Sequence, residues 1–451
     1  MIHATKILSD FSYNLSYDDL SAEVVETTKK YIADYFAAAF AGIKVNTVFN
    51  DAVNSVVLDM GGKEECDFIF SDKRLPAPNA AFLSACYAHG ADMDDGNRKA
   101  MGHVGAHVIS AVLTLAQTLS VSGKDIITAV NVGYEVYNRV AAAVQPGLVH
   151  RGFHSTGTAG AIACGAACAK LMGFDEDGIY NTMALSAIQA SGLIIIAESG
   201  QSCKPINPAN AAKTGIISAR IIEKGVRSSE FPLESKKGYF HAMSDDVDES
   251  MITDGLGEIF TICESYMKPY PSCRHTHCGI ECAVAIRSQL PKDAKVKAIK
   301  VYIYKNAIDI AGQITVPKVT DDAKFSVHYS LAVALQRGHF NLSDLDISNI
   351  DDELLGLIDA IELIEDPSME IRDEGIRGCK VVVVLDNGEE YEKTVLIPLG
   401  DAVNPLSWED IREKLRGCSE GLLSEEQQNK LMDNIISLDE FDSVGTINLY
   451  K

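Results

Sequence analysis

The sequence predicts a mostly α-helical protein, with a large helical domain formed by both chain ends and a smaller α+β domain. Three observations support this fold class. Apolar residues recur at helical spacing through the first half of the chain, strand-like composition is confined to residues 297–397, and a helical pattern returns after residue 404. Because 451 residues exceed one ordinary core, we expect two domains. We place the helical domain at residues 1–266 and 401–451, and the α+β lid at 267–400.

The helical domain contains clear signals for its elements. Ile32, Phe36 and Phe40 lie four residues apart and predict one buried helix face. We expect that helix to end at Gly42, since glycine is common at helix ends. Ser122 is a predicted N-cap. Two further helices are predicted where alanine and other small or apolar residues are frequent: 157–172 and 208–225.

The smaller domain is predicted from strand composition and a turn signal. Residues 297–304 and 379–385 are rich in β-branched residues, and Asp386-Asn387-Gly388 joins the second run to residues 389–397 as a β-hairpin. Residues 324–338 and 351–364 are predicted helices between these strands. Ser407 is the predicted N-cap of a tail helix that we expect to pack on the helical domain.

Charge and cysteine content narrow the function classes. The chain has 40 basic and 63 acidic residues, a formal net charge of −23, which argues against nucleic acid or an anionic membrane as partner. It shows no signal peptide and no run of about 18 apolar residues, so we expect a cytoplasmic protein. Its 11 cysteines include no C-x-x-C pair, so we interpret them as core residues rather than cluster ligands.

Positive charge is concentrated in one short segment of this acidic chain. Residues 268–277, Lys-Pro-Tyr-Pro-Ser-Cys-Arg-His-Thr-His, hold Lys268, Arg274, His275 and His277. Two prolines stiffen the backbone there. Stiff backbone with concentrated positive charge is typical of a site for a small polyanion.

A second segment concentrates carboxylates and histidines. It holds His89, Asp92, Asp94, Asp95, Asn97, His103 and His107. Such a group can bind a divalent metal, or it can supply a general acid or base together with the group that orients it. An acidic loop with a helix-capping aspartate is the alternative.

Three weaker motifs follow along the chain. In residues 151–158, RGFHSTGT, capping explains the hydroxyls but not His154, which could donate to a carboxylate or an enolate. Lys204 precedes a proline and could reach a pocket, although a lone lysine is usually a solvated charge. In residues 324–329, KFSVHY, the Tyr329 hydroxyl could complete a substrate site.

Together and in this order, these motifs resemble the MmgE/PrpD family over nearly the whole chain. The residues that carry the resemblance are HGADMDD from His89, GHVGAH from Gly102, RGFHSTGT from Arg151, CKP from Cys203, KPYPSCRHTH from Lys268, KFSVHY from Lys324 and GDAVNPLS from Gly400. The resemblance implies a helical domain from both chain ends, an α+β lid and a homodimer. It also implies chemistry that requires no metal, iron–sulfur cluster or organic cofactor.

The resemblance also implies which residues form the pocket: Asp92, His103, His154, Lys204, His277 and Tyr329. We expect His103 to transfer a proton, with Lys204 or His277 opposite it and Asp92 orienting one of them. From their residue types alone we add Lys268 and Arg274 as carboxylate clamps. The predicted substrate-binding set is His154, Lys268, Arg274, His275, Tyr329 and Asn97.

The expected function is a lyase, either a dehydratase or a decarboxylase, or an epimerase, acting beside a carboxylate of a small di- or tricarboxylate. All three reactions pass near an enolate-like state. Family members often have a histidine and an arginine after the lysine, where this chain has Asn207 and Asn210, which suggests fewer or differently placed substrate carboxylates. The alternatives are an iminodisuccinate-type epimerase, a metal hydrolase or metal-dependent lyase using Asp92, Asp94, Asp95 and His103, and a non-catalytic carboxylate-binding protein.

Overall fold

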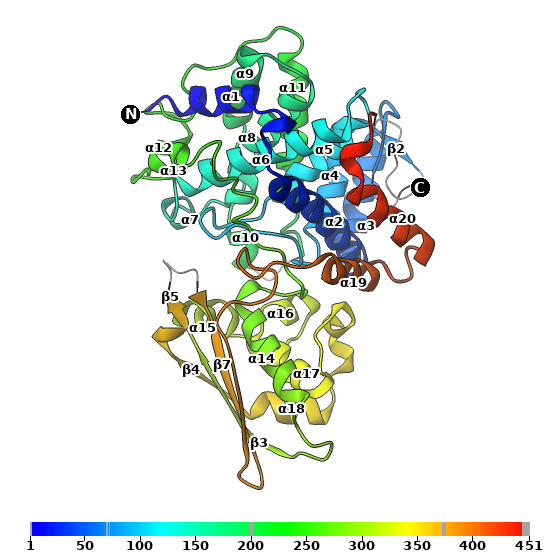
Figure 1. The fold of residues 1–451 in the computed structure, drawn as a ribbon, viewed down its shortest axis with the longest axis vertical. Coiled ribbons are helices and arrows are strands. Elements are labelled where there is room, and N and C mark those ends of the chain that lie inside the picture. Colours follow the sequence, from blue (N-terminus) through cyan, green and yellow to red (C-terminus); the bar gives the residue numbers. More distant parts are fainter. Residues whose placement is uncertain (1, 69–70, 72, 199–201, 372–375, 444–451) are drawn as a thin grey trace. The chain divides into compact units, whose positions relative to one another are not determined.

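The computed structural model describes residues 2–68, 71, 73–198, 202–371 and 376–443 (Figure 1). Helices account for most of these residues, which confirms the prediction of a mostly α protein. Contacts divide the chain into two compact units. The larger unit is Met1–Met267 with Trp408–Lys451, and the smaller unit is Lys268–Ser407. Among the described helices, none combines the length and the hydropathy that a membrane span requires.

Helix α2 (Ala22–Val45) forms part of the core of the larger unit. Ile32, Phe36 and Phe40 are buried on it, as predicted. The helix does not end at Gly42 but continues to Val45. A side chain at Gly42 would lie 1.9 Å from the carbonyl oxygen of Tyr87, so only glycine fits there. Glycine there allows helix α4 (Ala77–Ala88) to approach closely, which fixes the end of α4, where His89 follows.

Four further helices form the centre of this unit: α5 (Gly105–Ala116), α6 (Gly123–Ala142), α8 (Ser155–Leu171) and α11 (Ile206–Ile222). Ser122 caps α6 as predicted, since its hydroxyl accepts from the Asp125 N–H and the Asp125 carboxylate accepts in return. Helix α8 packs closely on α11 at Gly215. A side chain at this position would lie 2.4 Å from Cys164 Cβ, so glycine allows the close packing.

The remaining elements of the larger unit surround these helices. They are α1 (Ala4–Asn14), α3 (Thr47–Met60), α7 (Gly147–His150), α9 (Glu176–Ala187), α10 (Ile195–Glu198), α12 (Tyr239–Met243), α13 (Ser250–Thr253), α19 (Trp408–Ser419) and α20 (Glu425–Ile436). Helix α19 packs on α2 through a buried ion pair, 2.6 Å long, between Lys414 Nζ and Asp34 Oδ1. The unit is not purely helical as expected, since β1 (Cys66–Asp67) and β2 (Arg74–Leu75) form a short antiparallel ribbon. All cysteines except Cys203 and Cys263 are buried, in line with their interpretation as core residues.

The smaller unit is built on a four-stranded sheet in the order β4-β3-β7-β8. Strands β7 (Cys379–Leu385) and β8 (Glu390–Val395) form the predicted hairpin, and β3 (Val296–Ile303) pairs with β7 antiparallel. Helix α14 (His277–Arg287) packs on β7, on β8 and on α17 (Val327–Arg337), as Figure 1 shows. Helix α15 (Lys305–Ala311) and the ribbon of β5 (Glu370–Ile371) and β6 (Ile376–Arg377) complete it.

Two predicted helices of this unit have different limits in the structure. The helix expected over 351–364 ends as α18 (Asp352–Asp359), and β4 (Ile361–Glu365) follows, pairing in parallel with β3. Sheet pairing overrides the helical pattern there, because β3 offers its free edge to these backbone groups. The helix expected over 324–338 begins at Val327, since Ser326 caps it, and α16 (Thr320–Lys324) precedes it.

Candidate active site

The loop between α4 and α5 carries several of the predicted site residues of the larger unit, among them Asp92 and His103. Asp95 anchors it: its carboxylate accepts from the Gly105 N–H and from the Tyr134 hydroxyl, both at 2.8 Å. Asn97 and Gly102 pair through their backbones, which folds the loop back before His103. Burial, followed by the nearby Asp94, raises the pKa of the Asp95 carboxyl to about 7.

His103 is held in a defined orientation and tautomer. Its Nδ1 lies 2.7 Å from the backbone carbonyl oxygen of Asp95, and its backbone N–H donates to the Thr156 hydroxyl. A carbonyl oxygen can only accept, so Nδ1 carries the hydrogen and the neutral ring has its lone pair on Nε2. His103 therefore has the form of a general base, and its protonated ring could act as an acid.

Asp92 and Lys204 form an ion pair in which Nζ and Oδ1 lie 2.5 Å apart. Their side chains are 7% and 17% exposed, so this pair is largely withdrawn from water. Asp92 has φ 54°, a left-handed conformation that costs free energy in a non-glycine residue and is often found at functional sites. Lys204 lies directly before α11, and Gly200 and Gln201, which open its motif, lie outside the described residues.

His154 occupies the N-cap position of α8, and neither Ser155 nor Thr156 does. Asn207 Nδ2 lies 3.0 Å from His154 Nδ1 and also donates to the Leu193 carbonyl oxygen, which identifies it as the amide nitrogen. His154 Nδ1 therefore accepts, and the hydrogen is on Nε2. Burial, followed by the charge of Lys204, holds the pKa of His154 well below its ordinary value, so the ring is a neutral hydrogen-bond donor.

Three participants were not predicted as site residues. Asp94 Oδ2 lies 2.7 Å from His89 Nδ1 and 3.4 Å from His103 Nδ1, and Asn207 orients His154. The position of His89 at the end of α4 and the place of Asn207 one turn after Lys204 were available signals. Of the four predicted metal ligands, Asp94 and His103 lie together, whereas Asp92 pairs with Lys204 and Asp95 binds Tyr134 and Gly105.

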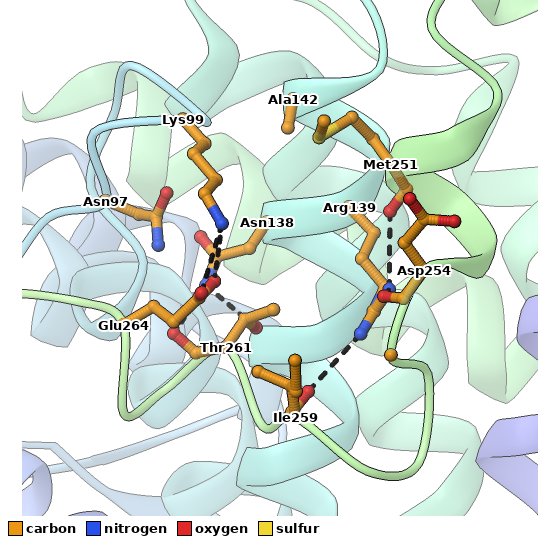
Figure 2. A pocket seen from close by; sticks show the side chains of 11 residues that line it. Asn97, Lys99, Asn138, Arg139, Ala142, Met251, Asp254, Ile259, Thr261 and Glu264 are labelled. Atoms are coloured by element: carbon orange, nitrogen blue, oxygen red, sulfur yellow. Dashed lines mark hydrogen bonds and ion pairs between the residues drawn. The ribbon is translucent and has the colours of Figure 1, made fainter. Parts of the chain in front are cut away.

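Asn97, a predicted substrate ligand, lies in the wall of a cavity that none of the other predicted site residues lines. Its side chain accepts from the Ala100 N–H and donates to the Ser265 hydroxyl. This cavity, about 230 Å³, lies in the larger unit and is also lined by Lys99, Asn138, Arg139, Thr261 and Glu264. Figure 2 shows that these side chains mainly bind one another: Lys99 pairs with Glu264, and Arg139 donates to backbone carbonyl oxygens.

In the smaller unit the basic segment, residues 268–277, leads into α14 and supplies its first residue, His277. Arg274 donates to the carbonyl oxygens of Leu399 and Pro398 and lies 3.5 Å from the Asp401 carboxylate. It also donates to His277 Nδ1, and His277 Nε2 lies 3.2 Å from the Ser272 carbonyl oxygen. Since arginine only donates, His277 Nδ1 accepts and its hydrogen is on Nε2.

The other predicted residues of this unit are also held internally. His275 Nδ1 contacts the Tyr304 hydroxyl, and Lys268 is 2% exposed. The Tyr329 hydroxyl donates to the Asp344 carbonyl oxygen at 2.6 Å, and burial raises the pKa of Tyr329 to about 12. Tyr329 is therefore a neutral, fully buried donor to backbone.

Comparison with protein families identifies the chain. The MmgE/PrpD N-terminal domain matches residues 6–251, and the MmgE/PrpD C-terminal domain matches residues 270–438. The chain belongs to the MmgE/PrpD family. The two matched regions together span most of the chain, as the motif resemblance had indicated.

Several curated members of the MmgE/PrpD family are similar along their whole length. The cis-aconitate decarboxylase of Aspergillus terreus is 23% identical, over 98% of this chain and 94% of its own. The human cis-aconitate decarboxylase is 24% identical, over 96% and 92%. The cis-aconitate decarboxylase-like protein oryM of Aspergillus oryzae is 23% identical, over 99% and 96%. These similarities support an enzyme of the MmgE/PrpD lyase type.

Proposed function

We propose that this protein is a cofactor-independent lyase that removes CO2 or water from a small di- or tricarboxylate through an enolate-like state. One observation carries the proposal: the larger unit contains a buried ion pair, Lys204 with Asp92, together with His103 and His154 in defined tautomers. Such a set combines proton transfer with stabilisation of developing negative charge, as this chemistry requires.

Each of these groups has a proposed role. His103 transfers the proton through Nε2, since Nδ1 donates to the Asp95 carbonyl oxygen. Lys204 stabilises the negative charge that develops on the substrate, and Asp92 holds Lys204 in place. His154 donates from Nε2–H to the enolate-like oxygen, and as a neutral ring it does so without adding charge.

The smaller unit supplies further proposed groups. We retain Lys268, Arg274, His275 and Tyr329 as proposed substrate ligands and His277 as a proposed acid or base. Arg274, His275, His277 and Tyr329 each bind a neighbouring group within their own unit. A homodimer in the cytoplasm remains part of the proposal.

The first substrate to test is cis-aconitate. The curated relatives that cover the whole chain are described as cis-aconitate decarboxylases. This chain has Asn210 where family members often have an arginine, so a related substrate with fewer or differently placed carboxylates is the next choice.

The decisive experiment is proton NMR of the purified enzyme in D2O. The panel contains cis-aconitate, trans-aconitate, citrate, 2-methylcitrate and iminodisuccinate, without added metal or cofactor. We expect loss of CO2 or new vinyl signals from one compound, with deuterium at the carbon that receives the proton. His241→Ala is the matched control, because His241 is exposed and distant in sequence from every proposed group.

The other outcomes separate the alternatives. Deuterium exchange at Cα without net conversion would replace the lyase by an epimerase. Binding of a carboxylate without turnover or exchange, with affinity unchanged in His103→Ala, would favour the non-catalytic binding protein. Activity that is lost with a chelator and restored by stoichiometric metal would favour the metal enzyme.

A further inference from the structure

One buried carboxylate in the larger unit lies between two imidazole rings. Asp94 Oδ2 is 2.7 Å from His89 Nδ1 and 3.4 Å from His103 Nδ1. The rings of His89 and His103 meet edge to face, with centroids 4.8 Å apart. The exposed fractions of the three side chains are 0% for His89, 3% for Asp94 and 12% for His103.

Burial makes this carboxylate unusual. An ionised carboxylate is costly to bury unless it is paired and hydrogen-bonded. Among the described residues, Asp94 Oδ1 has no hydrogen-bond partner, so the stabilisation falls on Oδ2 and its two histidines. The nearby cation Lys204 is already paired with Asp92. An arrangement serving only stability would satisfy both oxygens.

The neighbouring residue Asp95 orients His103 and holds the loop in place. The Asp95 carbonyl oxygen, at 2.7 Å, fixes the tautomer of His103, and the Asp95 side chain fixes the loop through Tyr134 and Gly105. The tautomer thus needs nothing from Asp94. What Asp94 adds at 3.4 Å is negative charge beside the imidazole, which favours its protonated form.

We propose that His89 and Asp94 are a positioning pair for His103: the Asp94 carboxylate stabilises the protonated ring that forms during proton transfer, and His89 holds that carboxylate in place. His89 donates from Nδ1 to Asp94, because a carboxylate accepts. Without this bond the Asp94 side chain could rotate away from His103 or take up a proton. The proposal rests on the lyase or isomerase chemistry proposed above.

Several other titratable groups lie near the pair, and most of them keep one protonation state near neutral pH. Burial lowers the pKa of His107 to about 3 and holds that of His154 well below its ordinary value, while it raises that of Tyr134 well above 10. His107 and His154 interact with His89, and Asp95 lies beside Asp94. Around them, Tyr134 binds Asp95, Tyr137 contacts the ring of His107, and Lys204 pairs with Asp92. Asp95, with a pKa raised to about 7, titrates near neutrality.

A metal ion is the competing explanation, since ligand atoms of His89, Asp94 and His103 lie within 4.8 Å of one another. The contacts favour hydrogen bonds instead. His103 Nδ1 directs its hydrogen at the Asp95 carbonyl oxygen, so a metal could bind this ring only through Nε2. His89 Nδ1 and Asp94 Oδ2, 2.7 Å apart, leave room for a hydrogen rather than a metal between them.

The first test needs no substrate and so stands independently of the proposed function. Histidine Cε1–H signals are followed by NMR against pH in the full-length protein with labelled histidine, with His103 identified by its loss in His103→Gln. We expect Asp94→Asn to lower the pKa of His103 by about 1 unit or more, because an opposite charge within about 6 Å is removed. His89→Asn, which keeps a donor at the Nδ1 position, should give a smaller shift than His89→Ala. An unchanged His103 titration in Asp94→Asn would overturn the proposal, and so would stoichiometric bound metal that this variant loses.

The second test separates positioning from stability once a substrate is known. Asp94→Asn should lower kcat by about 10- to 100-fold, as loss of a supporting hydrogen-bond partner commonly does, with a smaller change in KM. The limb of the pH profile of kcat/KM that reports His103 should move to lower pH with the pKa of His103. His89→Asn should recover most of the activity that His89→Ala loses. A loss of activity that follows the loss of Tm in all three variants, with no shift in the pH profile, would contradict the proposal.

Discussion

In the larger unit Lys204 pairs with a buried carboxylate, whereas in the smaller unit Arg274 donates mainly to backbone carbonyl oxygens. Both residues belong to groups that the sequence suggests as carboxylate-binding sites. The loop and helix ends of the larger unit bring together side chains that bind other side chains. The basic segment of the smaller unit, by contrast, ties the start of α14 to the residues that follow β8. A dense run of basic residues in the sequence can therefore serve the local fold as well as a ligand.

Removing the lysine of the larger unit should have the largest effect. Lys204→Met should lower kcat/KM by about 100-fold or more, because the developing negative charge loses its cation. Asp92→Asn should lower kcat/KM by a smaller factor, because asparagine also adopts the left-handed backbone conformation of Asp92. The double variant should be no worse than Lys204→Met alone, since the two residues act as a unit. Additive losses in steady-state kinetics would show that Asp92 acts separately on the substrate.

Asp95 should make the stability of the larger unit depend on pH. The Asp95 pKa, about 7 when folded, is raised above its unfolded value, so folding keeps its proton where the unfolded chain has lost it. Its contribution is complete below about pH 4 and is lost as pH rises towards about 7, on the order of 4 kcal/mol in the free energy of unfolding. The free energy of unfolding, measured by chemical denaturation across this pH range, should change less with pH in Asp95→Asn than in the wild type. Equal slopes in both proteins would refute the raised pKa.

Arg274→Lys tests whether the guanidinium of the smaller unit is structural. Lysine cannot reproduce the several donors that bind Leu399, Pro398 and His277, so we expect the free energy of unfolding to fall by about 1–3 kcal/mol. We expect only a small change in KM. A large rise in KM with Tm unchanged would instead make Arg274 a direct ligand of a substrate carboxylate.

Tyr329→Phe should have the smallest effect of the series. It removes one hydrogen bond to the Asp344 carbonyl oxygen and should cost about 1 kcal/mol of stability, measured by denaturation, with activity within about two-fold of the wild type. A strong loss of kcat at unchanged stability would show that the hydroxyl reaches the substrate during turnover.

Local signals predicted much of the fold. Ser122 starts a helix through its own hydroxyl group, as predicted, and Asp386-Asn387-Gly388 specifies the hairpin, so short-range chemistry suffices there. The strand at Ile361–Glu365 was missed because its partner β3 lies about 60 residues earlier in the chain. Gly42 was misjudged for a similar reason, since its role depends on Tyr87 of another helix.

The roles of the candidate site residues stay predictions. Residue type and order pointed to His103, His154, Lys204 and Asp92, which the structure brings into one unit. The sequence could not distinguish Asp92, which binds Lys204, from Asp94, which binds His89, because that choice depends on the left-handed turn at Asp92. It also could not show that His277 and Tyr329 are already bound to neighbouring backbone groups.

The most direct test of the account compares His103→Ala with His277→Ala for deuterium transfer to product in D2O, with cis-aconitate as the first substrate. If proton transfer takes place in the larger unit, His103→Ala should lose about 10²- to 10⁴-fold in the rate of deuterium transfer, while His277→Ala should lose clearly less. The reverse order, with His103→Ala close to the wild type and His277→Ala inactive but folded, would contradict it and move the reacting group to the smaller unit.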